Sequence, residues 1–450
     1  MKKSFWLLWS ILGLALVFLL DYSALGCEFV YDDLGIIVHN PYLHSRNLFT
    51  ALSFNPFRSL VYFTYWVQWQ LGASSQGFRI FNLLLHFLNG LLLLAFCGRL
   101  FEDKPLAGIF ASLGLWLNPI FLESVNLISG RFDLMMSFFY LLGLICYLSY
   151  SRGWKFRVGF YLALILALLS KEIAVSLPLV CLVLSWREDK ILSPKPIFFS
   201  ILLVLVFIFL RFNWTIILAK TSEQMPGWGE YFLAQNGLFW FSIFKVLIPA
   251  RLNFDYQLKI YFPLALAGLF FNIFFVGFLF FSLKKRKLFY RLILAGFLIY
   301  LPLALIPLAD IFRETRIYLF ALWIMLVFGL CLSWLGKERL KSILPLLGVI
   351  YLCFFSLCWE RAQKWRSAES LWRDSVKKSP LKFRPVYNYA NALRRKLKLK
   401  EAEQVYLWAE RLSPSDLRVK TNLELIRRIN QNPALLRELE ERFKAEQEIP

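Results

Sequence analysis

The sequence predicts an all-α, polytopic helical membrane protein that ends in a short soluble helical domain. Hydrophobic residues make up 58% of the 450 residues, which is more apolar surface than a soluble chain of this length could cover. Apolar runs of roughly 17–25 residues, long enough to cross about 30 Å of hydrocarbon, recur as far as residue 358. From Glu360 onward, charges of both signs mix with helix formers. We therefore expect a transmembrane domain over residues 1–359 and a soluble domain over residues 360–450.

The apolar runs predict about eleven spans. They lie near residues 4–20, 79–100, 105–122, 132–151, 157–170, 172–187, 196–218, 261–283, 292–309, 317–336 and 341–358. The fifth and sixth are the shortest, and they share a break at Ser170-Lys171-Glu172. The first follows two lysines, as a signal peptide would, but its apolar run is longer than a usual signal. We therefore expect it to remain as a span.

The positive charges predict the orientation, because Lys and Arg near span ends prefer the cytoplasm. With the N-terminus inside, the cytoplasmic loops carry Lys2/Lys3, Arg99/Lys104, Arg152/Lys155/Arg157, Arg187/Lys190/Lys195, Lys284/Lys285/Arg286/Lys287 and Lys337/Arg339/Lys341. The net charge of +21 then reflects topology and contact with lipid headgroups, and no nucleic-acid partner is expected. These features predict a multi-pass membrane protein whose C-terminal domain lies on the outer side of the membrane.

Two outer segments are apolar without being counted as spans. If residues 231–248 crossed the membrane, the basic cluster at 284–287 would lie outside, against the charge rule. We therefore expect a re-entrant or surface-lying helix there, which suits its aromatic residues. The first outer loop, residues 21–78, is the longest, and its aromatic segment 57–71 is expected along the membrane surface.

The tail carries a weak period of about 34 residues, the length of a tetratricopeptide repeat. Ala368, Trp372 and Pro380 recur as Ala402, Tyr406 and Pro414. This resembles one full tetratricopeptide repeat at 383–416, flanked by a half repeat and a degenerate pair at 417–446. So few repeats would be marginal alone, and we expect them to dock on the membrane domain. The alternative is an ordinary charged helical hairpin.

Ionisable residues near the hydrocarbon boundary are the main functional signal, because charge there is costly. Six carboxylates lie at or just beyond the outer ends of apolar runs: Asp32, Asp33, Glu123, Asp133, Glu172 and Glu314. Three cations lie beside them: Arg131, Lys171 and Arg316. Such a gathering on one face predicts an active site at a membrane surface.

The adjacent pair Asp32 and Asp33 cannot point in one direction on an extended or helical backbone. One can face a substrate as a general base while the other binds the scaffold or a cation. The first loop has no Asp-x-Asp triad, so a divalent cation is neither indicated nor excluded.

Structural explanations cover part of the remaining signal. Asp133 near a helix start can act as a cap, and Lys171 can pair with Glu172 to stabilise the fold. Arg316 starts a span on the outer side, against the charge rule. An anionic ligand such as a phosphate would account for it, since guanidinium binds phosphate with two donors.

Five motifs occur in one order along the chain. They are YDD at 31–33, NPIFLESVNLISGRFD at 118–133, LLSKEIAVSLP at 168–178, LNFDY at 252–256 and ETRIYL at 314–319. With the tail, this set resembles the membrane O-mannosyltransferases with tetratricopeptide tails and their bacterial relatives, which are type C glycosyltransferases. The resemblance covers nearly the whole chain.

The resemblance implies a sugar donor on polyprenyl phosphate and an acceptor hydroxyl, on a protein or a glycan, that approaches from outside. It implies an inverting displacement with Asp32 or Asp33 as the base. The implied donor-phosphate residues are Arg131, Lys171 and Arg316, and the implied site-shaping residues are Glu123, Asp133, Glu172, Asp255 and Glu314.

The chain departs from the family pattern in two places. Asn118 and Phe121 stand where the family often has histidines, which leaves the sugar and the use of metal open. The tail is shorter than in eukaryotic members, which leaves open whether the acceptor is a protein.

Two other functions fit the composition. A transporter or flippase of a lipid-linked saccharide would place its charges at the bilayer midplane within two related halves. A membrane anchor that presents the repeat to a protein partner would need one span and would leave the charged motifs unexplained. Both alternatives remain open from the sequence.

Overall fold

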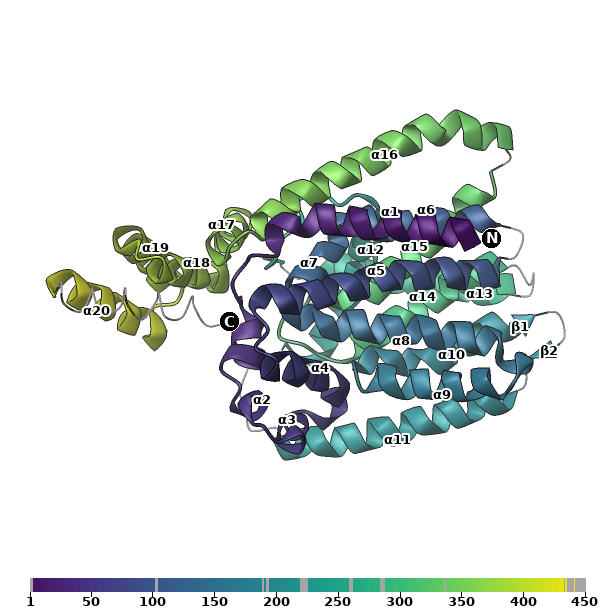
Figure 1. The fold of residues 1–450 in the computed structure, drawn as a ribbon, viewed down its shortest axis with the longest axis horizontal. Helices are drawn as coiled ribbons and strands as arrows, with labels where there is room; N and C mark the ends of the chain where they lie inside the picture. The colour runs from purple at the N-terminus through teal and green to yellow at the C-terminus, as the bar shows by residue number, and fades with distance from the viewer. Residues whose placement is uncertain are drawn as a thin grey trace.

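A computed structural model describes residues 3–101, 104–187, 190–191, 194–218, 226–258, 262–283, 288–335, 337–432, 434 and 441. Long helices form a bundle, and a smaller helical tail extends from one end of it (Figure 1). The long helices of the bundle are α1 (Lys3–Asp21), α5 (Ser75–Leu100), α6 (Pro105–Leu117), α8 (Arg131–Leu148), α9 (Trp154–Leu168), α10 (Leu177–Ser185), α11 (Pro194–Leu218), α12 (Trp228–Leu247), α13 (Phe262–Leu283), α14 (Leu288–Leu305), α15 (Tyr318–Ser333) and α16 (Lys337–Lys364). Two antiparallel strands of two residues each, β1 (Trp186–Arg187) and β2 (Lys190–Ile191), precede α11.

The protein is an all-α, multi-pass membrane protein. Eight helices among the described residues are long and apolar enough to cross a membrane. A ninth is formed if α6 and the short segment Pro119–Asn126, bent by 56° from it, are counted as one span. The bend lies just before Pro119. Proline has no backbone N–H, so it cannot continue the hydrogen bonding of the preceding helix.

The span count differs from the expected eleven in residues 154–187. Helix α9 has 15 residues, about 22 Å of helix, and Glu172–Ser185 is a shorter apolar segment. Neither reaches the ~30 Å of a hydrocarbon core. The break at residues 169–171 ends α9, and the charged residues at this break line the cavity described below.

Helix α12 has both ends at the same end of the bundle. The Trp228 indole donates to the Leu305 carbonyl at the end of α14 (3.1 Å), and Asn118, which follows α6, donates to the Val246 carbonyl (2.7 Å). Tyr300 near the end of α14 and Phe121 in the short segment after α6 both contact the start of α15. This course agrees with the expected surface-lying or re-entrant helix at 231–248. The basic cluster at 284–287 lies outside the described residues.

Close packing at the bundle centre joins α6 to α15. A Cβ atom on Gly329 would lie 2.3 Å from the Ala107 carbonyl oxygen, so only glycine permits this approach. Helix α15 is buried on most of its surface and carries the fully buried Trp323. The centre of the bundle is therefore a rigid support for residues at the end of α15.

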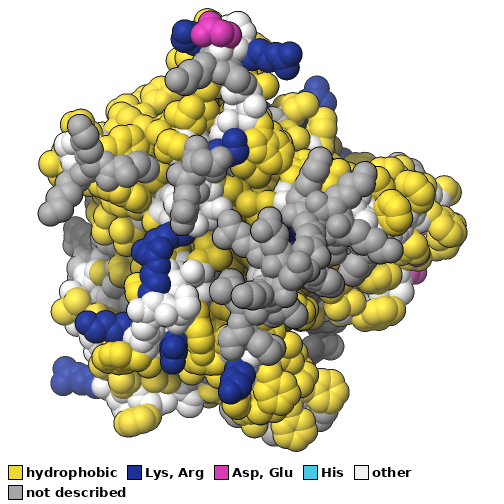
Figure 2. Space-filling model, turned by 90° about the vertical axis from the view of Figure 1, so that its right-hand side faces the viewer, with side chains coloured by type: hydrophobic (Ala, Val, Ile, Leu, Met, Phe, Trp, Pro, Cys, Tyr) yellow, Lys and Arg dark blue, Asp and Glu magenta, His cyan; other side chains and the backbone are white. Residues whose placement is uncertain are grey.

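The first outer loop folds into short helices over one end of the bundle: α2 (Pro41–His44), α3 (Leu48–Ser53) and α4 (Ser59–Gln70). The Tyr65 hydroxyl on α4 donates to the Ile128 carbonyl (2.9 Å). The opposite end of the bundle is shown in Figure 2, where Lys and Arg dominate the charged side chains in view. That is the end that the charge rule would place in the cytoplasm.

The tail contains α17 (Ala368–Lys378), α18 (Phe383–Arg395), α19 (Leu399–Leu412) and α20 (Leu417–Gln431). Each packs on the next, and α18 with α19 covers the expected full repeat. The expected boundary at 359/360 falls within α16, which continues to Lys364. The second half of the expected pair at 417–446 lies mostly outside the described residues.

The tail packs directly against the membrane domain. Trp365 and Trp372 meet the ring of Phe254, with centroid separations of 5.2 and 5.0 Å. The same buried cluster contains Cys27 and Val30 from the first outer loop. The two parts of the chain therefore share a core close to the Asp32 segment.

Candidate active site

A cavity of about 220 Å³ lies at the end of the bundle nearest the tail, between the first turn of α8, the end of α14, the segment before α15, and the first outer loop. Its charged walls are Asp32, Arg58, Asp133, Lys171, Glu172, Arg313 and Arg316. Its other walls include Ile36, Leu127, Phe132, Ile173, Leu303 and Leu308. An apolar enclosure of this kind strengthens every charge interaction inside it.

The adjacent aspartates have different environments. The Asp32 side chain is 39% exposed and lines the cavity. Asp33 is fully buried and accepts hydrogen bonds from the backbone amides of Ile128 (3.3 Å) and Ser129 (2.9 Å). Burial raises the pKa of Asp33 to about 6, although the charge of Arg79 and the two amides oppose the shift. Asp33 thus fastens the segment, and Asp32 is presented to the cavity.

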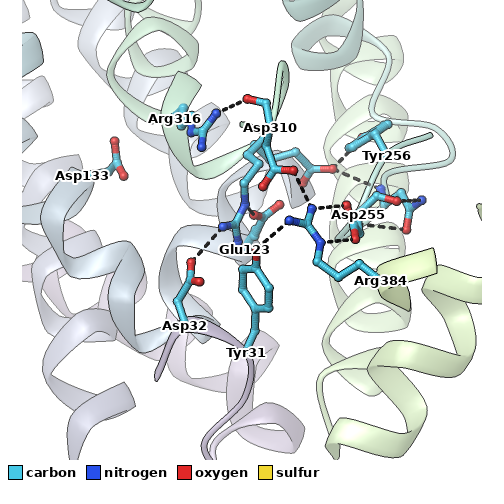
Figure 3. Close-up of polar contacts among 12 residues, drawn as sticks. Tyr31, Asp32, Glu123, Asp133, Asp255, Tyr256, Asp310, Arg316 and Arg384 are labelled. Carbon is cyan, nitrogen blue, oxygen red and sulfur yellow. Dashed lines mark hydrogen bonds and ion pairs between the residues drawn. The ribbon is translucent and has the colours of Figure 1, made fainter. Parts of the chain in front are cut away.

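Arg313 joins two of the carboxylates. Its Nη1 lies 2.9 Å from the Asp32 carboxylate, and its Nε lies 3.4 Å from the carboxylate of the fully buried Glu123 (Figure 3). Glu123 Oε2 and Arg313 Nη2 are buried without a hydrogen-bond partner among the described residues. Glu123 therefore lies behind the cavity wall, where it holds Arg313, and it does not line the cavity.

Two further ion pairs line the cavity. Lys171 lies 2.7 Å from both oxygens of Asp133, and Arg58 lies 2.9 Å from Glu172. The expected pairing of Lys171 with its neighbour Glu172 is thus replaced by longer-range pairs. Arg211 adds a third charge at 3.5 Å from Glu172.

Arg316 differs from the other cavity cations. Its Nη1 donates to the backbone carbonyl of Asp310 (Figure 3). Arg58, Lys171 and Arg313 each have a carboxylate within 4.0 Å, whereas Arg316 has none among the described residues. Its charge is therefore the least compensated in the cavity.

Three expected site residues have protein partners away from the cavity. Arg131 is fully buried, and its three donor nitrogens bond Asn82, Thr64 and the Phe78 carbonyl. Each of its three nitrogens has a protein partner, and Arg131 does not line the cavity, so its role as a phosphate ligand stays a prediction.

The other two residues belong to the contact with the tail. Glu314 is buried and pairs with Arg361 at 2.6 Å, and it accepts a hydrogen bond from Tyr256 (2.6 Å). Asp255 pairs with Lys382 and Arg384, both at 2.5 Å. Asp255 therefore joins the membrane domain to the tail, and the partners of Glu314 lie beside this contact, on α16 and in the segment that carries Asp255.

Sequence reasoning missed Arg58 and Arg313 as cavity residues. Arg58 had a signal, because it is a single cation in an aromatic outer segment, where the charge rule disfavours it. Arg313 stands beside the recognised Glu314 and Arg316, but its direction could not be read from the sequence. Within the described part of the chain, no three His, Cys, Asp or Glu side chains are placed to hold a metal ion.

The fold and the cavity define a multi-pass membrane protein with an enclosed, charged site at one end of its helical bundle. The chain is 24% identical to the protein O-mannosyl-transferase TMTC1 of Homo sapiens, over 89% of this chain and 54% of that protein. It is 28% identical to the protein O-mannosyl-transferase F38B6.6 of Caenorhabditis elegans, over 33% of this chain and 24% of that protein. It is also 28% identical to the protein O-mannosyl-transferase TMTC3 of Homo sapiens, over 29% of this chain and 16% of that protein.

The chain spans about half the length of TMTC1, the relative that it matches along most of its own length. No family model matches the sequence, and no solved structure matches it.

Proposed function

We propose that this protein is a membrane glycosyltransferase. It moves a sugar from polyprenyl phosphate to an acceptor hydroxyl on the outer face of a bacterial inner membrane. The observation that carries the proposal is the cavity itself, which combines a partly exposed carboxylate, Asp32, with Arg316, the least compensated of its cations. The names of the relatives support sugar transfer, and they favour a protein over a glycan as the acceptor.

In the proposed reaction Asp32 is the general base. The acceptor hydroxyl attacks the anomeric carbon while its proton passes to an Asp32 oxygen, and the bond from that carbon to the phosphate oxygen breaks. One displacement inverts the anomeric centre. A positioned base contributes typically 10²–10⁴-fold to such a step. Arg313 orients the Asp32 carboxylate through the 2.9 Å ion pair.

The leaving polyprenyl phosphate gains negative charge as the bond breaks. Arg316 is the proposed main phosphate ligand, because no carboxylate of the described residues forms an ion pair with its guanidinium. Lys171 lines the same cavity but already has Asp133 as a partner, so it is a secondary ligand. Preorganised donors of this kind are worth most where water is excluded.

An apolar groove offers a place for the prenyl chain. It has a volume of about 710 Å³ and runs between α12 and α13, with Gly237, Leu238, Phe241, Gly268 and Phe271 among its walls. The groove includes Ile311, and the cavity includes Arg313, so the two lie along the same loop before α15. A donor with a charged head and an apolar tail fits this combination.

Transfer and its dependence on Asp32 test the proposal. The purified protein in lipid nanodiscs is given a radiolabelled polyprenyl-phosphate mannose and a Ser/Thr-rich peptide. We expect labelled peptide from the wild type, and about 10²–10⁴-fold less from Asp32→Asn with donor binding unchanged. Asp416→Asn, a matched change at the N-cap of α20 in the tail, where asparagine can also cap, should retain activity.

Two results would count against the proposal. Wild-type turnover in Asp32→Asn would show that Asp32 is not the general base. A wild type that moves the intact lipid-linked sugar across vesicle membranes, without transfer, would favour a flippase. Transfer to a glycan in place of the peptide would keep the enzyme class and change the acceptor.

A further inference from the structure

Tyr31, the residue before Asp32, has an unusual backbone. Its φ angle is +53°, in the left-handed region that a bulky side chain rarely occupies. Such a conformation is strained for a residue with a side chain and persists where the surroundings over-determine it. Asp33, on the other side of Asp32, is fixed by two backbone amides. The direction of Asp32 therefore depends on what holds Tyr31.

The side chains that hold Tyr31 come from both the tail and the membrane domain. Arg384 on α18 donates to the Tyr31 hydroxyl (2.8 Å), and its guanidinium carbon lies 5.1 Å from the ring centroid (Figure 3). Trp372 on α17 meets the ring edge-on at 5.9 Å. From the membrane domain, Phe254 meets it at 5.6 Å and Arg313 lies over it at 4.9 Å.

Arg384 also links Tyr31 to two loops of the membrane domain. It donates to both oxygens of Asp255 (2.6 and 2.5 Å) and to Asp310 (2.6 Å). Burial alone would raise the pKa of Asp310, but the hydrogen bond and charge of Arg384 outweigh burial and lower it. Asp310 in turn accepts from Arg316 through its carbonyl. One tail side chain thus joins the base segment to the loop that carries the phosphate ligand.

We propose that the tail is part of the active site, with Arg384 as the positioning residue that holds Tyr31 left-handed and so aims Asp32 into the cavity. The inference rests on the proposed function for its kinetic part. It assigns the tail a role in sugar transfer itself, beyond any role in binding an acceptor or a partner.

The kinetic test uses Tyr31→Phe, which removes one hydrogen bond and leaves the ion pairs of Arg384 in place. A displacement of the base by about 1 Å can cost on the order of 10²-fold in rate. We expect Tyr31→Phe to lower kcat by about ten- to a hundredfold and to leave the KM for the donor unchanged. Arg384→Lys should lie between wild type and Arg384→Ala, because a point charge cannot reach three acceptors at once.

The second test does not need activity. Amide hydrogen exchange of the peptide that covers residues 29–34 should rise about tenfold or more in Arg384→Ala, since its local opening becomes easier. Peptides from α6 and α15 should keep wild-type protection. Arg418→Ala, which removes another tail arginine that pairs within the tail, is the control and should change neither kcat nor exchange at 29–34.

The outcomes separate the two proposals. Unchanged exchange at 29–34 in Arg384→Ala, or an unchanged kcat in Tyr31→Phe, would overturn the positioning role. If the wild type transfers no sugar but Arg384→Ala raises amide exchange at residues 29–34, the proposed function fails. The conclusion that the tail positions this segment then stands. If Arg384→Ala does not fold, exchange at 29–34 in Tyr31→Phe decides, with the same expected direction.

Discussion

Asp32 and Asp33 are identical side chains that have different roles because their surroundings differ. Asp33 is buried with backbone amides as partners, and Asp32 is half-exposed beside Arg313. The sequence could say that the two must point differently, because adjacent side chains diverge. It could not say which one faces the cavity, since that depends on the turn at residues 128–129 nearly a hundred positions away.

The burial of Asp33 predicts a pH dependence of stability. Its pKa is about 6 in the folded protein against an ordinary 3.8. A carboxyl with a raised folded-state pKa contributes stability below the unfolded pKa and loses it as pH rises through the folded pKa. The melting temperature of wild type relative to Asp33→Asn should therefore fall between about pH 4 and 6 and then stay level. Parallel melting curves from pH 4 to 7 would contradict the assignment.

Arg316 should act on the phosphate. Arg316→Ala should weaken the binding of sugar-free polyprenyl phosphate by about ten- to a hundredfold, as expected for losing a charged hydrogen bond of about 1.5–3 kcal/mol. Arg316→Lys should restore part of the affinity. Binding is measured by calorimetry, with the exposed outer-loop variant Arg46→Ala as the control. Equal affinities with a lower melting temperature would make Arg316 a structural residue.

At the scale of elements, the sequence predicted most of the spans and their order. Run length alone identified α1, α5, α8, α11 and α13–α16, because crossing a bilayer imposes a minimum length. Residues 154–187 departed from this pattern because charged groups interrupt the apolar run there.

The ion pairs were beyond the reach of sequence reasoning. Arg58 pairs with Glu172 and Arg313 with Asp32, and both pairs join segments that are distant along the chain. Many pairings of the same charges would satisfy the sequence equally well, and the packing of the helices selects one. The same packing turned Arg131 toward protein partners.

The groove between α12 and α13 predicts a dependence on donor chain length. A Cβ on Gly237 would meet open space, so Gly237→Leu should fold and partly fill the groove. Losing about 50 Å² of apolar contact would raise the KM for a long-chain donor by roughly tenfold. A donor with a short prenyl chain should be affected less. Gly229→Leu, also on α12 but away from the groove, is the matched control, and an equal effect there would rule the groove out.

At the scale of the whole molecule, the tail lies at one end of the bundle and the start of α16 lies at the other (Figure 1). A cysteine at Ser413 should react with a membrane-impermeant maleimide in intact spheroplasts. A cysteine at Arg339, in the first turn of α16 at the end that the positive-inside rule places in the cytoplasm, should react only after permeabilisation. Labelling of both from the same side would mean that the expected orientation and crossing count are wrong.

The fixation of Asp32 on both sides has a consequence for the pace of the reaction. Because Tyr31 and Asp33 are each held, the carboxylate can leave Arg313 and turn to an acceptor by rotating its own side-chain bonds. Exposed side chains change rotamer in picoseconds to nanoseconds, whereas loops take nanoseconds to microseconds and lids longer still. In the proposed reaction, Asp32 can therefore turn from Arg313 to the acceptor without closure of a loop. The slow step of turnover is then to be sought in the chemistry or in the departure of the spent lipid.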